Sequence, residues 1–285
     1  WNVQPQASSV AVKPNGFWLN ANDTWFGPTD LCFGPDGAVY VSDFHDRRTA
    51  HPDPDARWDR SNGRIYRVQG TAARSVPPVD VVSLPSRGLV KLLSHPNGWY
   101  ADRARVEMFR RKDKSIVPGL KAMARRRDDR RMALQGLWAV NASGGLDREF
   151  AIEMLSHADA WVRLWTVRLL GDRRQVSAPV GSAIGDLARR ETDPVVLVQL
   201  AASARRLPSD VGLPVASQLM QKKLPAADPR LPLMIWWALE EHVAEDRQEV
   251  LELFDTNSPL WKTLDGLRCG LLLVRRLAAE GTRSG

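Results

Sequence analysis

The sequence is poor in cysteine. Its 285 residues include only Cys32 and Cys269, and there is no CxxC motif, no CxxCH motif and no Cys/His cluster. The absence of these motifs argues against a structural zinc site and against covalent haem attachment within this stretch. Two cysteines so far apart leave the redox compartment open, and we expect each to be a buried thiol.

Long hydrophobic runs are missing as well. No stretch approaches the roughly 18 uncharged apolar residues of a membrane-spanning helix, so we expect no membrane span in this chain. No signal peptide is visible and the first residue is Trp1, so we expect the sequence to be a piece of a longer protein. Its 44% hydrophobic and 26% charged residues are typical of a globular protein with a sizeable core.

Glutamate is absent from the first 80 residues, which are rich in aromatic and β-branched residues and in Gly, Pro, Asn and Asp. This part carries a net charge of −1, whereas residues 81–285 carry +8. Composition and charge therefore change at the same place. We predict a β-rich part over residues 1–80 and a helical part over residues 86–285.

The β-rich part contains a clear hairpin signal. Two short apolar runs, residues 31–33 and 38–41, flank Pro35-Asp36-Gly37. Proline presets the backbone for a turn and glycine supplies the positive φ that follows it. A third strand is predicted over residues 63–68. Strand, turn, strand, long loop and strand make up most of one four-stranded blade, so residues 1–80 are predicted to be the C-terminal part of a β-propeller.

A long polar segment joins the second and third predicted strands. Residues 43–59 contain five aspartates and two histidines, and Arg60, Asn62 and Arg64 follow. Carboxylates and imidazoles can hold a cation, and guanidinium groups can hold a carboxylate or a sugar hydroxyl. Loops of this length are often functional. The alternative is a polar surface loop held by Asx-turns and Asp–Arg pairs, because its spacing matches no defined calcium loop.

From residue 86 onward, apolar residues recur at helical spacing. Helix-capping residues precede apolar helices at intervals of 30 to 35 residues, at Asn97, Asp128, Asp159, Asp193, Asp228 and Ser258. A second helix is expected in each interval, at residues 115–126, 146–157, 178–191, 212–223 and 247–255. About six such units predict an α-solenoid of HEAT- or armadillo-like helical hairpins. The expected fold class is therefore multi-domain, β then α: partial propeller blades followed by a solenoid.

Aromatic side chains recur through the helical part. We expect most of its tryptophans to be core residues: Trp99, Trp138, Trp161, Trp165, Trp236, Trp237 and Trp261. The sequence LSHPNGW (93–99) recurs 62 residues later as LSHADAW (155–161), which places His95 and His157 at equivalent positions. We expect both histidines to serve in turns and caps rather than as ligands.

The basic residues are densest at 110–112 and 125–127, but acidic residues interleave them. No aromatic residues suited to base stacking accompany them at regular intervals. We therefore interpret these clusters as solvated helix faces, and nucleic acid is not an expected partner.

Two modules in this order resemble a known family. The sequences FGPDGAVYVSD (33–43) and DRSNGRIYRV (59–68) are similar to the last propeller blade of the large planctomycete and verrucomicrobial "membrane-bound dehydrogenase" proteins, also called PVC-type haem-binding proteins. LSHPNGW (93–99) and VRLWTVRLLGD (162–172) resemble the HEAT-type region that follows it.

The resemblance implies part of an extracytoplasmic or periplasmic dehydrogenase acting on sugars or polysaccharide-derived substrates. Its propeller is similar to glucose and sorbosone dehydrogenases, so the whole protein is expected to use PQQ, calcium and haem c, with no cofactor or metal site within this chain. His51 is the candidate general base. The candidate substrate- or cofactor-binding residues are Asp43, Asp59, Arg60, Asn62 and Arg64.

The alternative is a non-catalytic propeller and HEAT protein that acts as a binding or scaffold module. Its partner is then a carbohydrate-like small molecule or a protein held by the solenoid.

Overall fold

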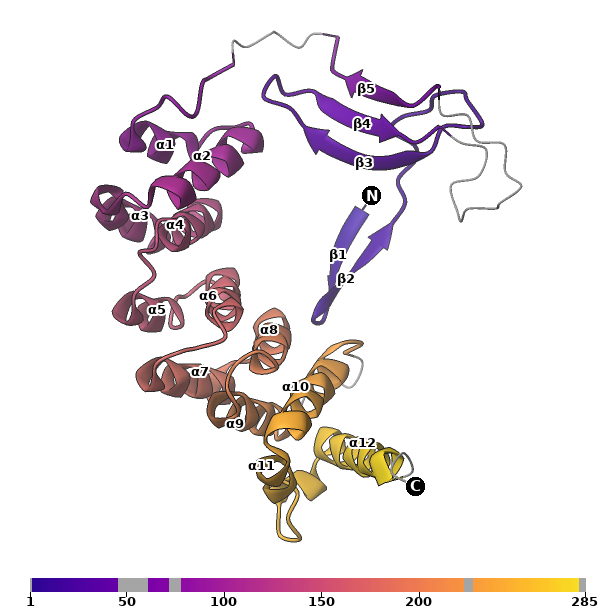
Figure 1. The fold of residues 1–285 in the computed structure, drawn as a ribbon, viewed down its shortest axis with the longest axis vertical. Helices are drawn as coiled ribbons and strands as arrows, with labels where there is room; N and C mark the ends of the chain where they lie inside the picture. The colour runs from indigo at the N-terminus through magenta and orange to yellow at the C-terminus, as the bar shows by residue number, and fades with distance from the viewer. Residues whose placement is uncertain (1, 46–60, 72–77, 223–227, 282–285) are drawn as a thin grey trace. The chain divides into compact units, whose positions relative to one another are not determined.

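The computed structural model describes residues 2–45, 61–71, 78–222 and 228–281. In these ranges five strands precede all of the helices, so the predicted order of β then α is confirmed (Figure 1). The chain divides into two compact units, Asn15–Val117 and the combination of Trp1–Pro14 with Pro118–Gly285. The boundary expected between residues 80 and 86 stays a prediction.

The unit Asn15–Val117 contains an antiparallel sheet in the order β3-β4-β5. Its strands are β3 (Pro28–Phe33), β4 (Val39–Asp43) and β5 (Arg64–Val68). The turn between β3 and β4 forms where the sequence predicts it. Gly37 has φ +76°, and the Asp36 carboxylate accepts a hydrogen bond from the N–H of Ala38 at 3.1 Å.

The same unit holds α1 (Ser86–Leu92), α2 (Gly98–Arg111) and the short 3₁₀ helix η1 (Lys114–Ile116). Asn97 caps α2, because its side-chain oxygen accepts from the N–H of Trp99 at 3.0 Å. Its amide nitrogen donates to the carbonyl of Gly34 at 2.9 Å. One asparagine thus starts the helix and ties it to the hairpin turn.

The other unit begins with an antiparallel hairpin of β1 (Asn2–Gln6) and β2 (Ser9–Lys13). At its tip, the backbone N–H and the hydroxyl of Ser8 donate to the two carboxylate oxygens of Asp228 at 2.9 and 2.6 Å. Asp228 also accepts from the N–H of Leu231 at 2.9 Å. This carboxylate therefore serves the hairpin and the start of the following helix together.

The helices of this unit lie in chain order, with one further 3₁₀ helix, η2. They are α3 (Val117–Ala124), α4 (Arg130–Ala142), α5 (Arg148–Met154), α6 (Ala160–Asp172), α7 (Ala178–Arg190), α8 (Pro194–Ala204), α9 (Ser209–Met220), α10 (Leu231–Glu245), α11 (Arg247–Glu252), η2 (Pro259–Lys262) and α12 (Leu264–Gly281). Within the described ranges, no helix combines the length and apolar character needed to cross a lipid bilayer.

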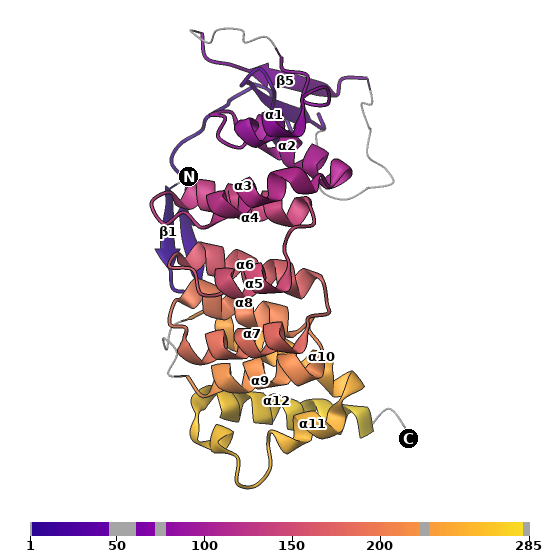
Figure 2. The same cartoon turned by 90° about the vertical axis from the view of Figure 1, so that its left-hand side faces the viewer.

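Alternate helices form two rows. α4, α6, α8 and α10 contact one another in succession, and α5, α7 and α9 do the same. Figure 1 shows the rows side by side, and Figure 2 shows α5, α7 and α9 in front. Each helix therefore buries its apolar side against its neighbours in both rows.

The predicted helix caps are mostly confirmed. Asp159 and Asp193 accept from the backbone N–H two residues later, at 2.8 and 3.0 Å, and Ser258 starts η2 in the same way. The prediction for Asp128 is wrong by one residue, because Asp129 caps α4 and Asp128 pairs with Arg126 instead. Two adjacent aspartates offered the same signal, and only the backbone conformation distinguishes them.

The expectation of a tryptophan-rich core is wrong for several positions. Trp161 is 40% exposed, and Trp237 and Trp261 are 37% and 36% exposed. The buried side of α6 carries Val162 and Val167 instead, both fully buried. Leucine and alanine dominate the core, where leucine fills the space between helices and the small side chain of alanine lets them approach closely.

Polar contacts also join segments that lie about 30 residues apart in the sequence. The carboxylate of Glu153 accepts two hydrogen bonds from Arg125, 28 residues earlier, at 2.7 and 2.8 Å. His157 Nε2 lies 3.1 Å from the carbonyl oxygen of Arg126, 31 residues earlier. These contacts hold the α3 segment against the α5 segment, in addition to the packing of their apolar side chains.

Candidate functional site

Asp43, a predicted binding residue at the end of β4, is buried and has a structural task. Its Oδ1 accepts hydrogen bonds from the N–H groups of Gly27 and His45 at 2.9 and 2.8 Å. Its backbone pairs with Arg64 at the start of β5. These contacts fix the corner at which the chain leaves the sheet.

His45 and the predicted binding residue Arg64 meet at this corner. Arg64 Nη1 lies 3.1 Å from His45 Nδ1, and the ring is 7% exposed. The carboxylates of Asp43 and Asp23 lie 3.7 and 3.6 Å from the same ring nitrogen. Because a guanidinium can only donate, we assign the imidazole proton to Nε2. Nδ1 then accepts from Arg64, so it is not available as a general base.

Of the remaining predicted residues, the structure describes one. Asn62 lies exposed shortly before β5. His51, Asp59 and Arg60 lie outside the described residues. The structure therefore brings together only Asp43 and Arg64 from the predicted set, and it adds His45 to them.

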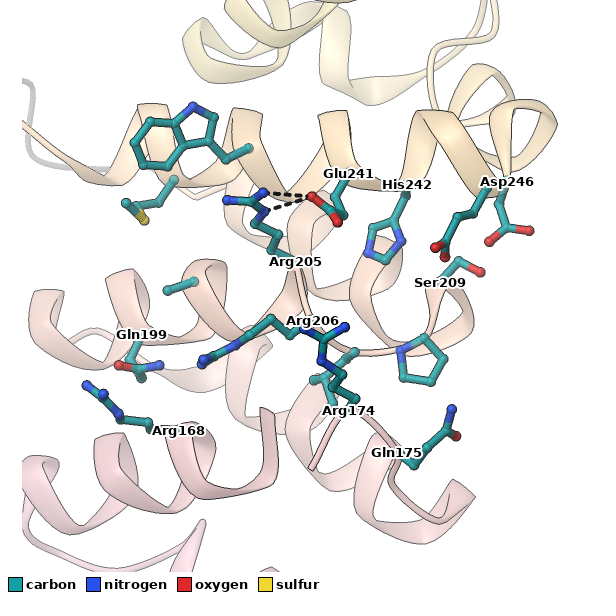
Figure 3. Close-up of a pocket in the computed structure, with 16 residues that line it drawn as sticks. Arg168, Arg174, Gln175, Gln199, Arg205, Arg206, Ser209, Glu241, His242 and Asp246 are labelled. Carbon is teal, nitrogen blue, oxygen red and sulfur yellow. Dashed lines mark hydrogen bonds and ion pairs between the residues drawn. The ribbon is translucent and has the colours of Figure 1, made fainter. Parts of the chain in front are cut away.

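A second candidate site lies between α6, α8 and α10. None of its residues was predicted as a site residue from the sequence. A cavity of about 750 Å³ opens there, lined by side chains from these helices and from the segments that follow α6 and α8. We call it the arginine groove, after Arg168, Arg174, Arg205 and Arg206. Figure 3 shows His242 of α10 among them.

His242 is the buried group of the arginine groove. His242 is only 2% exposed, and its Nε2 lies 3.0 Å from the carbonyl oxygen of Ala204. A Cβ on Gly212 would lie 2.5 Å from that Nε2, so α9 approaches the ring closely. Since a carbonyl only accepts, Nε2 carries the proton and Nδ1 is an acceptor. Nδ1 is buried and has no hydrogen-bond partner among the described residues.

Three of the four arginines are engaged by acidic or aromatic neighbours. Arg205 donates to Glu241 at 2.8 and 2.9 Å, as the dashed lines in Figure 3 show. Arg206 pairs with Asp172 through Nη1 at 2.6 Å, and Arg168 lies over the ring of Trp165. These contacts hold the guanidinium groups in place.

Two donor groups of the arginine groove are left over. Arg206 Nε is buried and has no acceptor among the described residues. Arg174 has no ion-pair or hydrogen-bond partner for its side chain within the described part of the chain, and its backbone has φ +59°. Glycine is the usual residue at such a position just after a helix, so an arginine there carries a conformational cost.

The sequence contained a weak signal for this groove. Paired arginines at 173–174 and 205–206 directly follow α6 and α8, 32 residues apart. The denser clusters at 110–112 and 125–127 drew attention instead, but Arg110, Arg125 and Arg126 pair with Glu107, Glu153 and Asp128. The position of arginines directly after helices therefore indicated this groove better than the local density of basic residues did.

Metal coordination has little support in the described ranges. There, no group of three or more His, Cys, Asp or Glu side chains is placed to hold a metal ion. The arginine groove is suited instead to an organic anion, because guanidinium groups bind carboxylates with directed hydrogen bonds.

Comparison with known proteins gives one partial match. Residues 4–72 match a family described as "Domain of unknown function (DUF7133)". No curated protein and no solved structure matches the chain. The matched stretch spans β1 to β5 and ends before the helices that form the arginine groove.

Proposed function

We propose that this chain is a binding and scaffold module in which the arginine groove holds a carboxylate ligand. The module consists of a propeller-type blade and a solenoid of HEAT-like helical hairpins. The antiparallel meander β3-β4-β5 with its Pro-Asp-Gly turn supports the blade. The two rows of alternating helices support the solenoid.

One observation carries the proposed function: the guanidinium of Arg174 lines the arginine groove and has no ion-pair or hydrogen-bond partner among the described residues. The other three arginines of the groove are held by Glu241, Asp172 and the ring of Trp165. Arg174 is therefore the group with which a bound carboxylate pairs.

A binding role also agrees with the contacts made by His45 and by the predicted binding residues Asp43 and Arg64. Arg64 occupies Nδ1 of His45, and Asp43 Oδ1 accepts from two backbone N–H groups, whereas Asp43 Oδ2 is buried and has no hydrogen-bond partner among the described residues. These bonds give His45 Nδ1 and Asp43 Oδ1 a structural role.

The test is a ligand-observed NMR titration of the full chain with cyclohexanecarboxylate. We expect Arg174→Gly to weaken binding about tenfold, the loss of one charge-assisted contact. Lys112→Gly is the matched control, since Lys112 is also a basic residue at positive φ just after a helix but lies outside the groove. Equal affinity in the wild type and Arg174→Gly, or no binding by any of the three proteins, would overturn the proposal.

A second candidate function is a sugar dehydrogenase of the PVC-type family, with PQQ, calcium and haem c in the whole protein and an extracytoplasmic location. The cluster of buried Asp43 and His45 with exposed Arg64 favours it, because these residues flank in sequence the segment that contains His51, Asp59 and Arg60. Dye reduction with aldoses, PQQ and calcium tests this candidate in the full-length protein. Activity unchanged in His51→Ala and Arg60→Ala would remove these residues from the mechanism.

A further inference from the structure

We infer that the outer face of α12 is a docking surface for an amphipathic helix of a partner protein, one that carries acidic residues along an edge of its apolar side. We call this surface the α12 stripe, and it consists of Leu264, Leu267, Leu271 and Val274. The inference goes beyond the proposed function, because none of these residues lines the arginine groove.

The α12 stripe is an exposed group of large aliphatic side chains. Its four residues are between 44% and 71% exposed. No other helix in the described ranges exposes more than two large hydrophobic residues. The opposite side of α12 is covered within this chain, since Cys269 and Leu273 are buried there. Single exposed apolar residues are normal, but a contiguous group of them marks an interaction surface.

The spacing of the stripe specifies a helical occupant. Its residues follow one another by three, four and three positions, which is the pattern by which one helix packs along another in a coiled coil. The arrangement of the helices agrees with this, because α12 contacts α10 just as α10 contacts α8 (Figure 1). Among the described residues, α8 and α10 have a helix of this row on both sides, whereas α12 has one only on the side of α10.

The charge beside the stripe is positive. Arg268 and Arg275 are exposed and lie seven residues apart, so they follow the same edge of the helix. Arg268 has a buried partner on α12 itself, Asp265, at 3.2 Å. Arg275 has no ion-pair or hydrogen-bond partner among the described residues. A helix that covers the stripe therefore complements this edge if it carries carboxylates there.

The molecule already joins the helices of this row by such pairs. Arg205, which directly follows α8, donates to Glu241 of the next helix in the row, α10, at 2.8 and 2.9 Å. Glu240 of α10 pairs with Arg276 of α12 at 3.3 Å. A carboxylate opposite Arg275 would repeat the contact that Arg205 makes with α10.

A second copy of this chain fits the surface poorly. If two α12 helices packed stripe against stripe in antiparallel directions, the arginines of both copies would lie along the same edge and repel one another. In a parallel pair, Arg268 and Arg275 would lie opposite Gly270 and Leu277 of the other copy, which offer no charge. Neither arrangement supplies a carboxylate to Arg275, so we commit to an acidic helix as the occupant.

The experiment measures the binding of two synthetic peptides to the full chain by fluorescence anisotropy. Each peptide has three heptads with leucine at the two core positions, and the residues that flank the leucines are glutamate in one peptide and lysine in the other. We expect the acidic peptide to bind at least about tenfold more tightly than the basic one.

Two variants test the two parts of the surface. Arg275→Gln should reduce the preference for the acidic peptide about threefold, whereas Arg127→Gln, which removes another exposed arginine away from α12, should leave it unchanged. Leu271→Gln should weaken both peptides about tenfold, and Val106→Gln, at an exposed position of α2, is its control. Because Leu271 is exposed, we expect Leu271→Gln to fold, so a loss of binding reports on the surface.

Three outcomes would overturn the inference. Equal affinity for the two peptides removes the acidic character of the partner. No binding of the acidic peptide removes the docking surface itself. A wild-type dimer that Leu271→Gln converts to a monomer, as followed by sedimentation, assigns the α12 stripe to a second copy of the chain. None of these outcomes affects the test of the arginine groove, which uses a different ligand and a different variant.

Discussion

Arg163 and Glu191 are joined by a two-pronged ion pair across 28 residues of sequence. Arg163 Nε and Nη2 donate to the two carboxylate oxygens at 2.7 and 3.0 Å. Both side chains are largely buried, with 16% and 4% exposure. Glu191 also accepts from the N–H of Asp193, the cap of α8. The pair thus fixes α6 to the start of α8.

Arg163→Leu is expected to lower the free energy of unfolding by about 2–3 kcal/mol, because it leaves a buried carboxylate without its partner. Urea denaturation measures the difference. Arg148→Leu is the control, since Arg148 pairs with its exposed neighbour Glu149, and we expect a change below about 1 kcal/mol there. Equal costs for the two variants would show that the buried pair has no special weight.

The same carboxylate is expected to contribute to acid sensitivity. Burial raises the pKa of Glu191, but the hydrogen bonds from Arg163, Asp193 and Thr192 outweigh it and leave the pKa below its usual value. The unfolded chain therefore binds the proton more readily than the folded chain. Its contribution is fully present above about pH 5 and is lost as the pH falls through the lowered pKa.

Glu191→Gln isolates this contribution. The stability difference between wild type and Glu191→Gln should be constant above about pH 5 and shrink at lower pH, as followed by urea titrations across the range. A difference that stays constant down to pH 3, or grows as the pH falls, would contradict the assignment.

Side-chain burial predicts a sharp contrast between two large residues. Leu200 of α8 is 1% exposed, so Leu200→Ala should cost about 2–5 kcal/mol of folding free energy. Trp161 is 40% exposed, so Trp161→Ala should cost about 1 kcal/mol or less. Thermal or urea unfolding of both variants checks the phase of these helices, and a reversed order would mean that the helix faces are misassigned.

The two cysteines should differ in reactivity. Burial raises the pKa of the Cys269 thiol to about 12, whereas Cys32 lies exposed on β3. Thiolate is the reactive form, so at pH 8 iodoacetamide should modify Cys32 and spare Cys269 until the protein is unfolded. Peptide mass spectrometry distinguishes the two sites. Rapid modification of native Cys269 would contradict its burial.

Local signals in the sequence predicted the elements well. The hairpin at Pro35-Asp36-Gly37 and the cap at Asp159 each depend on a few neighbouring residues, and both are present. His95 and His157 hold turns as expected, since each Nδ1 accepts from the N–H two residues later at 3.0 Å. The expectation for the cysteines is right for Cys269 and wrong for Cys32.

The arginine groove could not be predicted in this way. Arg174, Arg206 and His242 span almost 70 residues and meet only after α6, α8 and α10 have packed together. The exposure of Trp161 has a similar cause. Apolar periodicity predicts which side of a helix is apolar, but it does not predict which residues on that side a neighbouring helix covers. Both depend on packing between units, for which a single sequence carries no local signal.

The contact between Ser8 and Asp228 spans 220 residues. A contact between residues so far apart in sequence forms only after a long loop has closed, which costs conformational entropy. Contacts between neighbouring helices close shorter loops and are expected to form earlier. Folding of this unit is therefore expected to finish with the hairpin, whose arrival completes the hydrogen bonding of a carboxylate already positioned by α10. The earliest residues of the chain would then be among the last to take their native place.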